Sequence, residues 1–210
     1  MQPAIHHLIF DLGGLFIDVY MDRFANSLQQ LVGKEVAPTL EKLKHEKFFD
    51  AYETGHIHTA QFLDTLSAAF GKEYSQEQYV ACWNAILGRV QLDQLQLIQP
   101  LRKQCDVVLL SNTNSLHVEA LETEFEKSHP GERLSNFFDR IYYSQQIGLR
   151  KPEAAAFRFV VQQGAFHPAH TLFIDDSLGH LQGAQTLGLQ TLLHPQNAPL
   201  LPSLQKAGLL

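Results

Sequence analysis

The sequence predicts an α/β fold, in which a core built on a parallel sheet carries a small all-helical cap inserted after the first strand. Three observations lead to this prediction. Short apolar runs recur along the chain, as in buried parallel strands. Helical patterns lie between most of these runs, so strands and helices alternate. One long interval, from about Val19 to Leu95, shows helical spacing and no strand pattern.

Each predicted strand ends at a polar residue. In chain order the runs are Leu8–Phe10 before Asp11, Val107–Leu110 before Ser111-Asn112, Ile141–Tyr143 before Ser144, Leu172–Ile174 before Asp175-Asp176, and Thr191–Leu193 before His194. Ligands of such sheets bind beyond the carboxyl ends of the strands. We therefore expect these polar residues at one edge of the sheet.

Three helices are expected between the later strands: Ser115–Glu126, Pro152–Gln163 and about Leu178–Leu187. Pro152 suits the first turn of its helix, which places Lys151 just before that helix. In the early interval, Ser75 is placed to cap a helix from Gln76 to Leu87. The expected domains are a discontinuous core, residues 1–18 and 96–210, and a helical cap, residues 19–95.

Composition narrows the function classes. A chain of 210 residues should bury about 70% of its unfolded surface, so it needs no disulfide or metal to fold. Its net charge of −6 argues against binding to nucleic acids or to anionic membranes. Cys82 and Cys105 form no CxxC pair, and no apolar run approaches the ~18 residues of a membrane span. Because the N-terminus also carries no cationic leader pattern, we expect a soluble, reduced, cytoplasmic protein.

Two motifs could carry chemistry at the first two strand ends. Asp11 precedes Gly13 and Gly14, which let the backbone turn close to a ligand. Asp11 is a candidate nucleophile or metal ligand, or else a turn-forming residue. Ser111 and Asn112 have side chains that suit phosphate oxygens, or else they cap the following helix.

Two further motifs follow later in the chain. Lys151 could neutralise a phosphoryl group and a carboxylate, although an isolated lysine is usually a surface residue. Asp175 and Asp176 repel each other after a buried strand unless a cation or a lysine relieves them. A Mg²⁺ site is therefore credible there, and capping of the next helix by one of the two is the alternative.

The order of these motifs along the chain resembles the haloacid dehalogenase (HAD) superfamily, which consists mainly of phosphatases. The matching segments are Phe10-Asp11-Leu12-Gly13-Gly14, Leu110-Ser111-Asn112-Thr113-Asn114, Gly148-Leu149-Arg150-Lys151-Pro152-Glu153 and Phe173-Ile174-Asp175-Asp176-Ser177. The resemblance implies a Rossmann-like core and a helical cap of the C1 type (subfamily IA). It extends to a bacterial subgroup acting on α-D-glucose 1-phosphate, and more distantly to the phosphatase domain fused to soluble epoxide hydrolase.

The resemblance also implies roles for the motif residues. Asp11 would attack phosphorus and form an aspartyl-phosphate, and Lys151 would link the phosphate to Asp11. The phosphoryl oxygens would be bound by Ser111 and Asn112. Mg²⁺ would be held by the Asp11 carboxylate, the Gly13 carbonyl and Asp176, with Asp175 assisting or acting through water.

The sequence departs from the family pattern at two positions. Most phosphatases of this superfamily have a second Asp where this chain has Gly13, so a general acid worth about 10²–10⁴-fold in rate is missing. This favours a good leaving group, such as that of a sugar 1-phosphate, or a replacement acid: Asp18, Glu53 or a histidine of the cap (His56 or His58). Asp18 alternatively caps the start of the cap helices. The second departure is His180, where the family often has Asn or Asp.

We therefore expect a Mg²⁺-dependent phosphomonoesterase that acts on a small phosphorylated metabolite, such as a sugar phosphate, as a monomer or homodimer. A metal-independent haloacid dehalogenase also lacks the second Asp, but the paired acids argue against it. A non-catalytic phosphate-binding regulator is the third hypothesis. The joint presence of Asp11, Ser111, Lys151 and Asp176 argues against such a loss of activity.

Overall fold

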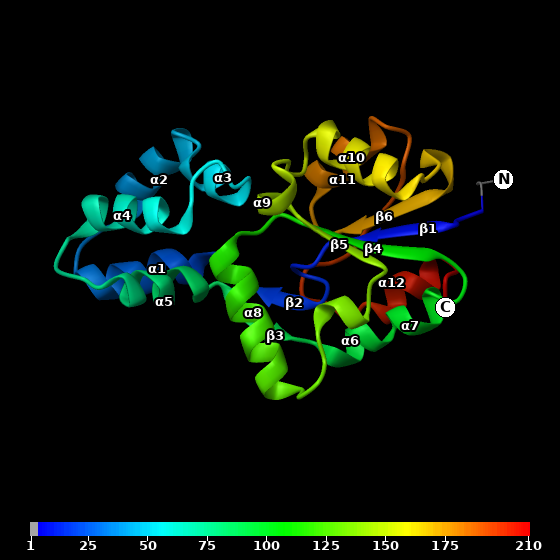
Figure 1. Ribbon diagram of the computed structural model, residues 1–210, viewed down its shortest axis with the longest axis horizontal. Helices are drawn as coiled ribbons and strands as arrows, with labels where there is room; N and C mark the ends of the chain where they lie inside the picture. The colour runs from blue at the N-terminus through cyan, green and yellow to red at the C-terminus, as the bar shows by residue number, and fades with distance from the viewer. Residues whose placement is uncertain (1–3) are drawn as a thin grey trace.

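The computed structural model describes residues 4–210 and has the expected α/β architecture (Figure 1). Residues 1–3, at the start of the predicted core, lie outside the described residues. Five parallel strands form the sheet in the order β5-β4-β1-β6-β7. Their bounds are β1 His7–Phe10, β4 Asp106–Ser111, β5 Arg140–Tyr143, β6 Thr171–Asp175 and β7 Gln190–Leu193.

The central strand, β1, has a continuous apolar run because both of its faces are buried. Leu8, Ile9 and Phe10 are all fully buried. Leu8 and Phe10 pack into the cluster on one face of the sheet, and Ile9 packs into the cluster on the other. Because helices cover both faces, these three positions do not face water and show no polar alternation; His7, at the start of the strand, is partly exposed.

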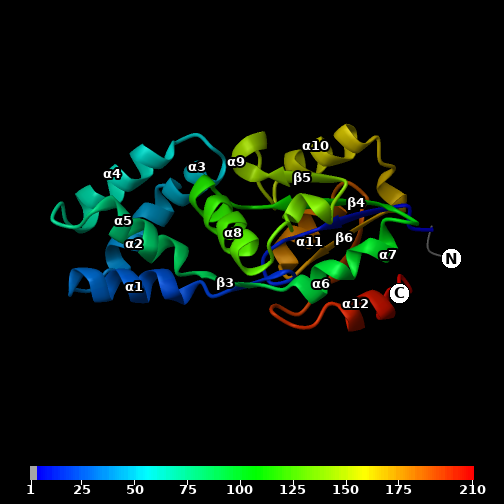
Figure 2. The ribbon, with the colours of Figure 1, turned by 60° about the horizontal axis from the view of Figure 1, so that its bottom comes forward.

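The helices of the core divide between the two faces (Figures 1 and 2). One face is covered by α6 (Leu92–Gln96), α7 (Ile98–Leu101), α8 (Ser115–Ser128) and α12 (Leu201–Lys206). The other is covered by α10 (Ala154–Gly164) and α11 (Leu178–Gln185). Short helical turns connect the elements: η1 (Leu134–Asn136), α9 (Ser144–Ile147) and η2 (Pro168–His170).

The helical insert after β1 has a hydrophobic cluster of its own, around Phe62, Tyr79 and Trp83. Its helices are α1 (Asp22–Val32), α2 (Ala37–His45), α3 (Phe48–Glu53), α4 (Thr59–Phe70) and α5 (Gln76–Asn84). Ser75 caps α5 as expected, because its hydroxyl accepts from the Gln78 N–H and its own N–H donates to the Gln78 side chain. The domain division at residues 18 and 96 stays a prediction.

Two expectations about local structure are wrong. The interval 19–95 does contain a strand, β3 (Leu87–Val90), which pairs antiparallel with β2 (Ile17–Val19), and α5 ends before it at Asn84. Gly88 lets the ribbon close tightly, because a Cβ there would lie 2.6 Å from the Asp18 Cβ. The helix expected from Pro152 begins at Ala154, and Pro152 lies in the turn ahead of it.

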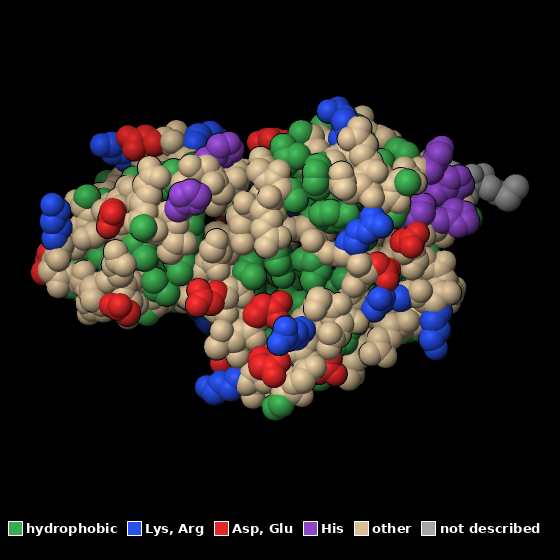
Figure 3. All heavy atoms as spheres, viewed as in Figure 1, with side chains coloured by type: hydrophobic (Ala, Val, Ile, Leu, Met, Phe, Trp, Pro, Cys, Tyr) green, Lys and Arg blue, Asp and Glu red, His purple; other side chains and the backbone are tan. Residues whose placement is uncertain are grey.

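The surface fits the weakly acidic composition. Figure 3 shows basic and acidic side chains interspersed over the face in view. Within residues 4–210, no helix has the length and apolar character needed to cross a membrane.

Candidate active site

The predicted site residues meet at the carboxyl ends of the central strands. Asp11 follows β1, Ser111 ends β4 and Asp175 ends β6. A cavity of ≈ 290 Å³ opens there, with walls from both the core and the helical insert. Of the site residues predicted from the sequence, five line this cavity: Asp11, Gly13, Ser111, Asn112 and Asp176. A larger depression of ≈ 880 Å³ lies around the opposite ends of the strands and contains none of them.

Lys151 lies between two carboxylates. Its side chain is fully buried, and Nζ lies 2.7 Å from Asp11 Oδ1 and 2.8 Å from Asp175 Oδ2. Burial alone would lower the pKa of Lys151, but the two facing carboxylates raise it, so the ammonium is kept charged. The alternative of a surface lysine is therefore wrong.

The two carboxylates that share Lys151 differ in their surroundings. Burial raises the pKa of Asp11; Lys151 opposes that rise and Asp175 adds to it. Burial also acts to raise the pKa of Asp175, but Lys151 and His180 lower it overall. His180 Nδ1 lies 2.9 and 3.0 Å from the two Asp175 oxygens, and the Ser177 N–H donates to Oδ1 at 2.8 Å. Asp175 is thus the better stabilised carboxylate of the two.

Asp176 adds a third carboxylate on the cavity wall. Its pKa is raised to about 6 by burial and by the charges of Asp11 and Asp175. Its near neighbour Gly14 has φ +73°, and a Cβ there would lie 2.4 Å from Asp176 Oδ2, so only glycine lets the turn approach this carboxylate. Helix capping by one of the paired acids is not observed, because Ser177 caps α11.

This arrangement of charges fits a divalent cation. Two carboxylates share one lysine and a third, that of Asp176, lines the same cavity; carboxylate and carbonyl oxygens are the ligands that Mg²⁺ prefers. Ligand atoms of Asp11, Asp175 and His180 lie within 4.8 Å of one another. Both Asp175 oxygens and His180 Nδ1 already have partners, however, so Asp11 and Asp176 are the carboxylates better placed to ligate directly.

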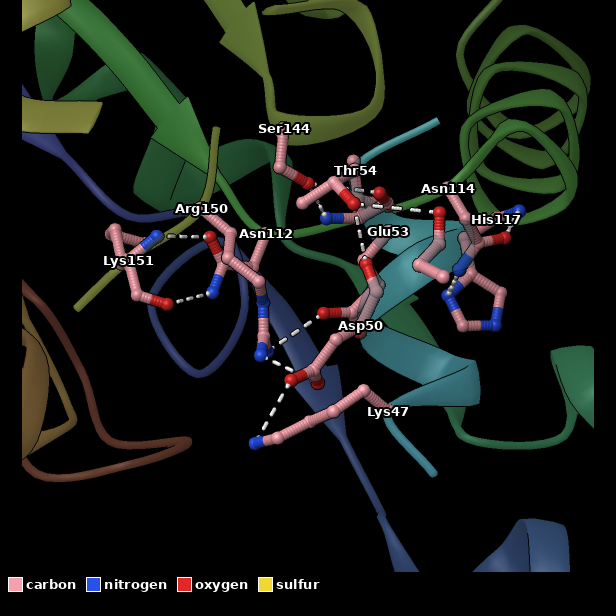
Figure 4. Close-up of polar contacts among 12 residues, drawn as sticks. Lys47, Asp50, Glu53, Thr54, Asn112, Asn114, His117, Ser144, Arg150 and Lys151 are labelled. Atoms are coloured by element: carbon pink, nitrogen blue, oxygen red, sulfur yellow. Dashed lines mark hydrogen bonds and ion pairs between the residues drawn. The ribbon is translucent and has the colours of Figure 1, made fainter. Parts of the chain in front are cut away.

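Ser111 and Asn112 have different surroundings. Ser111 is buried on the cavity wall, where it could bind a phosphoryl oxygen. The Asn112 side chain instead holds the backbone of Lys151 from both sides: Oδ1 accepts from the Lys151 N–H at 2.9 Å, and Nδ2 donates to the Lys151 carbonyl at 2.8 Å (Figure 4). Neither residue caps α8, because Asn114 does.

Of the replacement acids considered, Glu53 lines the cavity, and Asp18, His56 and His58 do not. Asp18 accepts a hydrogen bond from Gln91 at 2.7 Å. It does not cap the insert either, because α1 has no side-chain cap. Burial raises the pKa of Glu53, and Arg150 opposes that rise from 2.9 Å.

Sequence reasoning assigned no role to several residues on the cavity wall. Arg150 pairs with the insert, and Trp83 stacks on His117 with ring centroids 4.8 Å apart. Burial lowers the pKa of His117 to about 4, so this ring is neutral at physiological pH. The one sequence signal for Arg150 is its place directly before Lys151.

The polar residues at the two remaining strand ends have structural partners. Ser144 forms hydrogen bonds with the backbone of Thr113, and the His194 ring forms one with the Ser203 hydroxyl.

Comparison with known proteins adds independent findings. A family model for haloacid dehalogenase-like hydrolases matches residues 5–188. The chain is 30% identical over 194 residues to D-ribitol-5-phosphate phosphatase of Bacteroides thetaiotaomicron, covering 92% of this chain and 93% of the relative.

Two crystal structures are also similar. A HAD family enzyme from Bacteroides thetaiotaomicron, in complex with magnesium and inorganic phosphate, has a TM-score of 0.80 and 29% identity over 93% of this chain and 96% of that one. A HAD-like hydrolase from Porphyromonas gingivalis has a TM-score of 0.86 and 28% identity over 98% of both chains. The resemblance to a subgroup acting on α-D-glucose 1-phosphate is not among these findings.

Proposed function

Because the chain belongs to the haloacid dehalogenase-like hydrolase family, we propose that it is a Mg²⁺-dependent phosphatase acting on a small phosphorylated polyol or sugar. The observation that carries the proposal is the buried Lys151 ammonium held between Asp11 and Asp175, with Asp176 on the wall of the same cavity. The magnesium and phosphate bound in a relative's crystal structure support the same chemistry.

Each of the site residues would have a distinct role in phosphoryl transfer. Asp11 Oδ1 is held by Lys151, which leaves Oδ2 to attack phosphorus; the ester P–O bond would break, the alcohol would leave with a proton, and water would then hydrolyse the aspartyl-phosphate to phosphate and free Asp11. Lys151 and the backbone and hydroxyl donors around Ser111 and Asn112 would bind the equatorial phosphoryl oxygens. Mg²⁺, held by Asp11, the Gly13 carbonyl and Asp176, would offset the repulsion between the carboxylate and the phosphate dianion.

The relative's substrate bears on the missing acid at Gly13. Ribitol 5-phosphate is an ester of an ordinary primary alcohol, so it lacks the acidic leaving group of a sugar 1-phosphate. By analogy, we propose a linear polyol phosphate as the preferred substrate and place α-D-glucose 1-phosphate second. Glu53 is then the candidate proton donor to the leaving oxygen, because its carboxyl group lines the cavity and burial raises its pKa.

A metabolite panel tests this function. Phosphate release would be measured from ribitol 5-phosphate, other polyol and sugar phosphates, and α-D-glucose 1-phosphate, with Mg²⁺ and with chelator. We expect the highest kcat/KM for a polyol phosphate, loss of activity in chelator, and no turnover by Asp11→Asn. If no ester exceeds the Asp11→Asn background, the proposal fails. Halide release from a 2-haloacid without Mg²⁺ would show a dehalogenase instead.

A further inference from the structure

One ion-pair cluster joins the helical insert to the core beside the candidate active site. Arg150 Nη1 lies 2.6 Å from Asp50 Oδ1, and Nη2 lies 2.9 Å from Glu53 Oε2 (Figure 4). Both acids belong to α3 of the insert, whereas Arg150 belongs to the loop between α9 and α10 of the core. All three side chains are at least partly buried, between 22 and 35% exposed, so the contacts are shielded better than ordinary surface pairs.

The same loop holds the catalytic lysine. Arg150 is followed by Lys151, whose backbone N–H and carbonyl are both bonded by the Asn112 side chain and whose Nζ bridges Asp11 and Asp175. A displacement of Arg150 by the insert would therefore move the next residue, Lys151, whose Nζ holds Asp11.

A second contact seats the insert at the same place. Gly55, just after α3, has φ +70°, and a Cβ there would lie 2.4 Å from the carbonyl oxygen of Gln145 in α9. The turn of the insert thus rests directly on the short helix that precedes the Arg150 loop. Contact and ion pairs together fix α3 over the cavity that Glu53 and Arg150 line.

The charges argue against Arg150 as a binder of the substrate's phosphate. Both of its Nη nitrogens already face carboxyl oxygens of α3, those of Asp50 and Glu53, which leaves neither to bind a phosphate. Its guanidinium instead forms one ion pair at each Nη, and both acidic partners belong to α3, so it joins the core loop to this helix of the insert.

We propose that Arg150 is a positioning residue that clamps the insert to the Lys151 loop through Asp50 and Glu53. The proposal rests on the proposed phosphatase function for its kinetic readout. Asp50 does not line the cavity; its nearer charged partner is Arg150 at 2.6 Å, and its other partner, Lys47 at 3.5 Å, is largely exposed and also lies outside the cavity.

A double-mutant cycle tests the clamp. We expect Arg150→Met to lower kcat about tenfold, equivalent to about 1.4 kcal/mol. A loss should appear with both ribitol 5-phosphate and p-nitrophenyl phosphate, because both carry the phosphoryl group that Lys151 would bind; it should be larger with ribitol 5-phosphate, since Arg150 also pairs with Glu53, the candidate acid. Asp50→Asn should cost about threefold and nothing further in the Arg150→Met background, since it acts through Arg150. Arg150→Lys should recover part of the loss, because lysine keeps the positive charge but lacks the planar guanidinium that reaches two acids at once.

Arg102→Met is the matched control. Arg102 pairs with Asp139 at 2.7 Å and is also partly buried, 33% exposed against 23% for Arg150, but neither Arg102 nor Asp139 lines the cavity. This variant should keep the wild-type kcat. Multiplicative losses in the double mutant, a loss confined to the polyol ester, or wild-type kcat in Arg150→Met would each overturn the clamp.

A readout independent of turnover separates this proposal from the proposed function. Trp83, the single tryptophan of the sequence, belongs to the insert and donates to Asn114 of the core at 3.1 Å. Loosening of the insert should raise acrylamide quenching of its fluorescence in Arg150→Met but not in Arg102→Met. If the wild type releases no phosphate from any ester, the proposed function fails; if quenching is unchanged in Arg150→Met, the clamp fails.

Discussion

Asp176→Asn should stabilise the metal-free protein while abolishing its activity. In the absence of a cation, the Asp176 carboxylate faces the negative charges of Asp11 and Asp175, with one lysine to relieve all three. Asparagine has nearly the same shape as the carboxyl group and carries no charge. The substitution therefore removes repulsion from the folded state, and with it one of the oxygen ligands assigned to Mg²⁺.

The expected magnitude follows from the pKa of Asp176, which is raised from 3.8 to about 6. A raised folded-state pKa means that the folded state binds the proton more tightly, so stability falls as the pH rises from about 4 to about 6. A shift of that size corresponds to about 3 kcal/mol at 1.36 kcal/mol per pKa unit. Asp176 is only partly buried, and solvent screening reduces this to about 1–2 kcal/mol above pH 7.

Urea unfolding in chelator measures the effect. At pH 7.5 the free energy of unfolding of Asp176→Asn should exceed that of the wild type by about 1–2 kcal/mol, and at pH 4 the difference should fall below half of that. Added Mg²⁺ should raise the stability of the wild type more than that of the variant. A variant that is no more stable than the wild type at pH 7.5 would show that Asp176 is not repelled by Asp11 and Asp175 in the folded state.

Two further predictions concern the lysine and the seat of the insert. Lys151→Met leaves two buried carboxylates without their cation, so it should abolish phosphate release and cost about 3 kcal/mol in urea unfolding at pH 7.5; an unchanged midpoint would contradict this. Gly55→Ala should destabilise the chain more than Gly33→Ala: both positions have positive φ, but only the Gly55 Cβ would meet a backbone atom, that of Gln145, whereas the Gly33 Cβ meets nothing within 4 Å. Equal losses in thermal unfolding would show that the contact with Gln145 is unimportant.

Much of the core and its site could be predicted because the relevant signals are local. β1 is buried on both faces of the sheet, and a strand in that position requires a continuous apolar run, here Leu8, Ile9 and Phe10. Asp11 and Asp175 stand at the ends of such runs, and parallel strands bring those ends to one edge.

What could not be predicted depends on contacts between distant segments. β3 has one buried residue, Val90, so four residues leave no periodic pattern to recognise. The pairing of Arg150 with Asp50 joins segments far apart in sequence, and nothing local selects these partners among the other charged residues. The sequence suggested that the Asn112 amide binds phosphate, because amides suit phosphate oxygens. In the structure this amide forms hydrogen bonds with the backbone of Lys151, a residue distant in sequence.

In the proposed function, Asp11 becomes phosphorylated during turnover. Acid quenching of the enzyme at work on ribitol 5-phosphate with Mg²⁺, followed by peptide mass spectrometry, tests it most directly. We expect a phosphoryl adduct on the peptide that contains Asp11, lost in chelator and absent from Asp11→Asn. Phosphate release without any such adduct, or undiminished in Asp11→Asn, would contradict it.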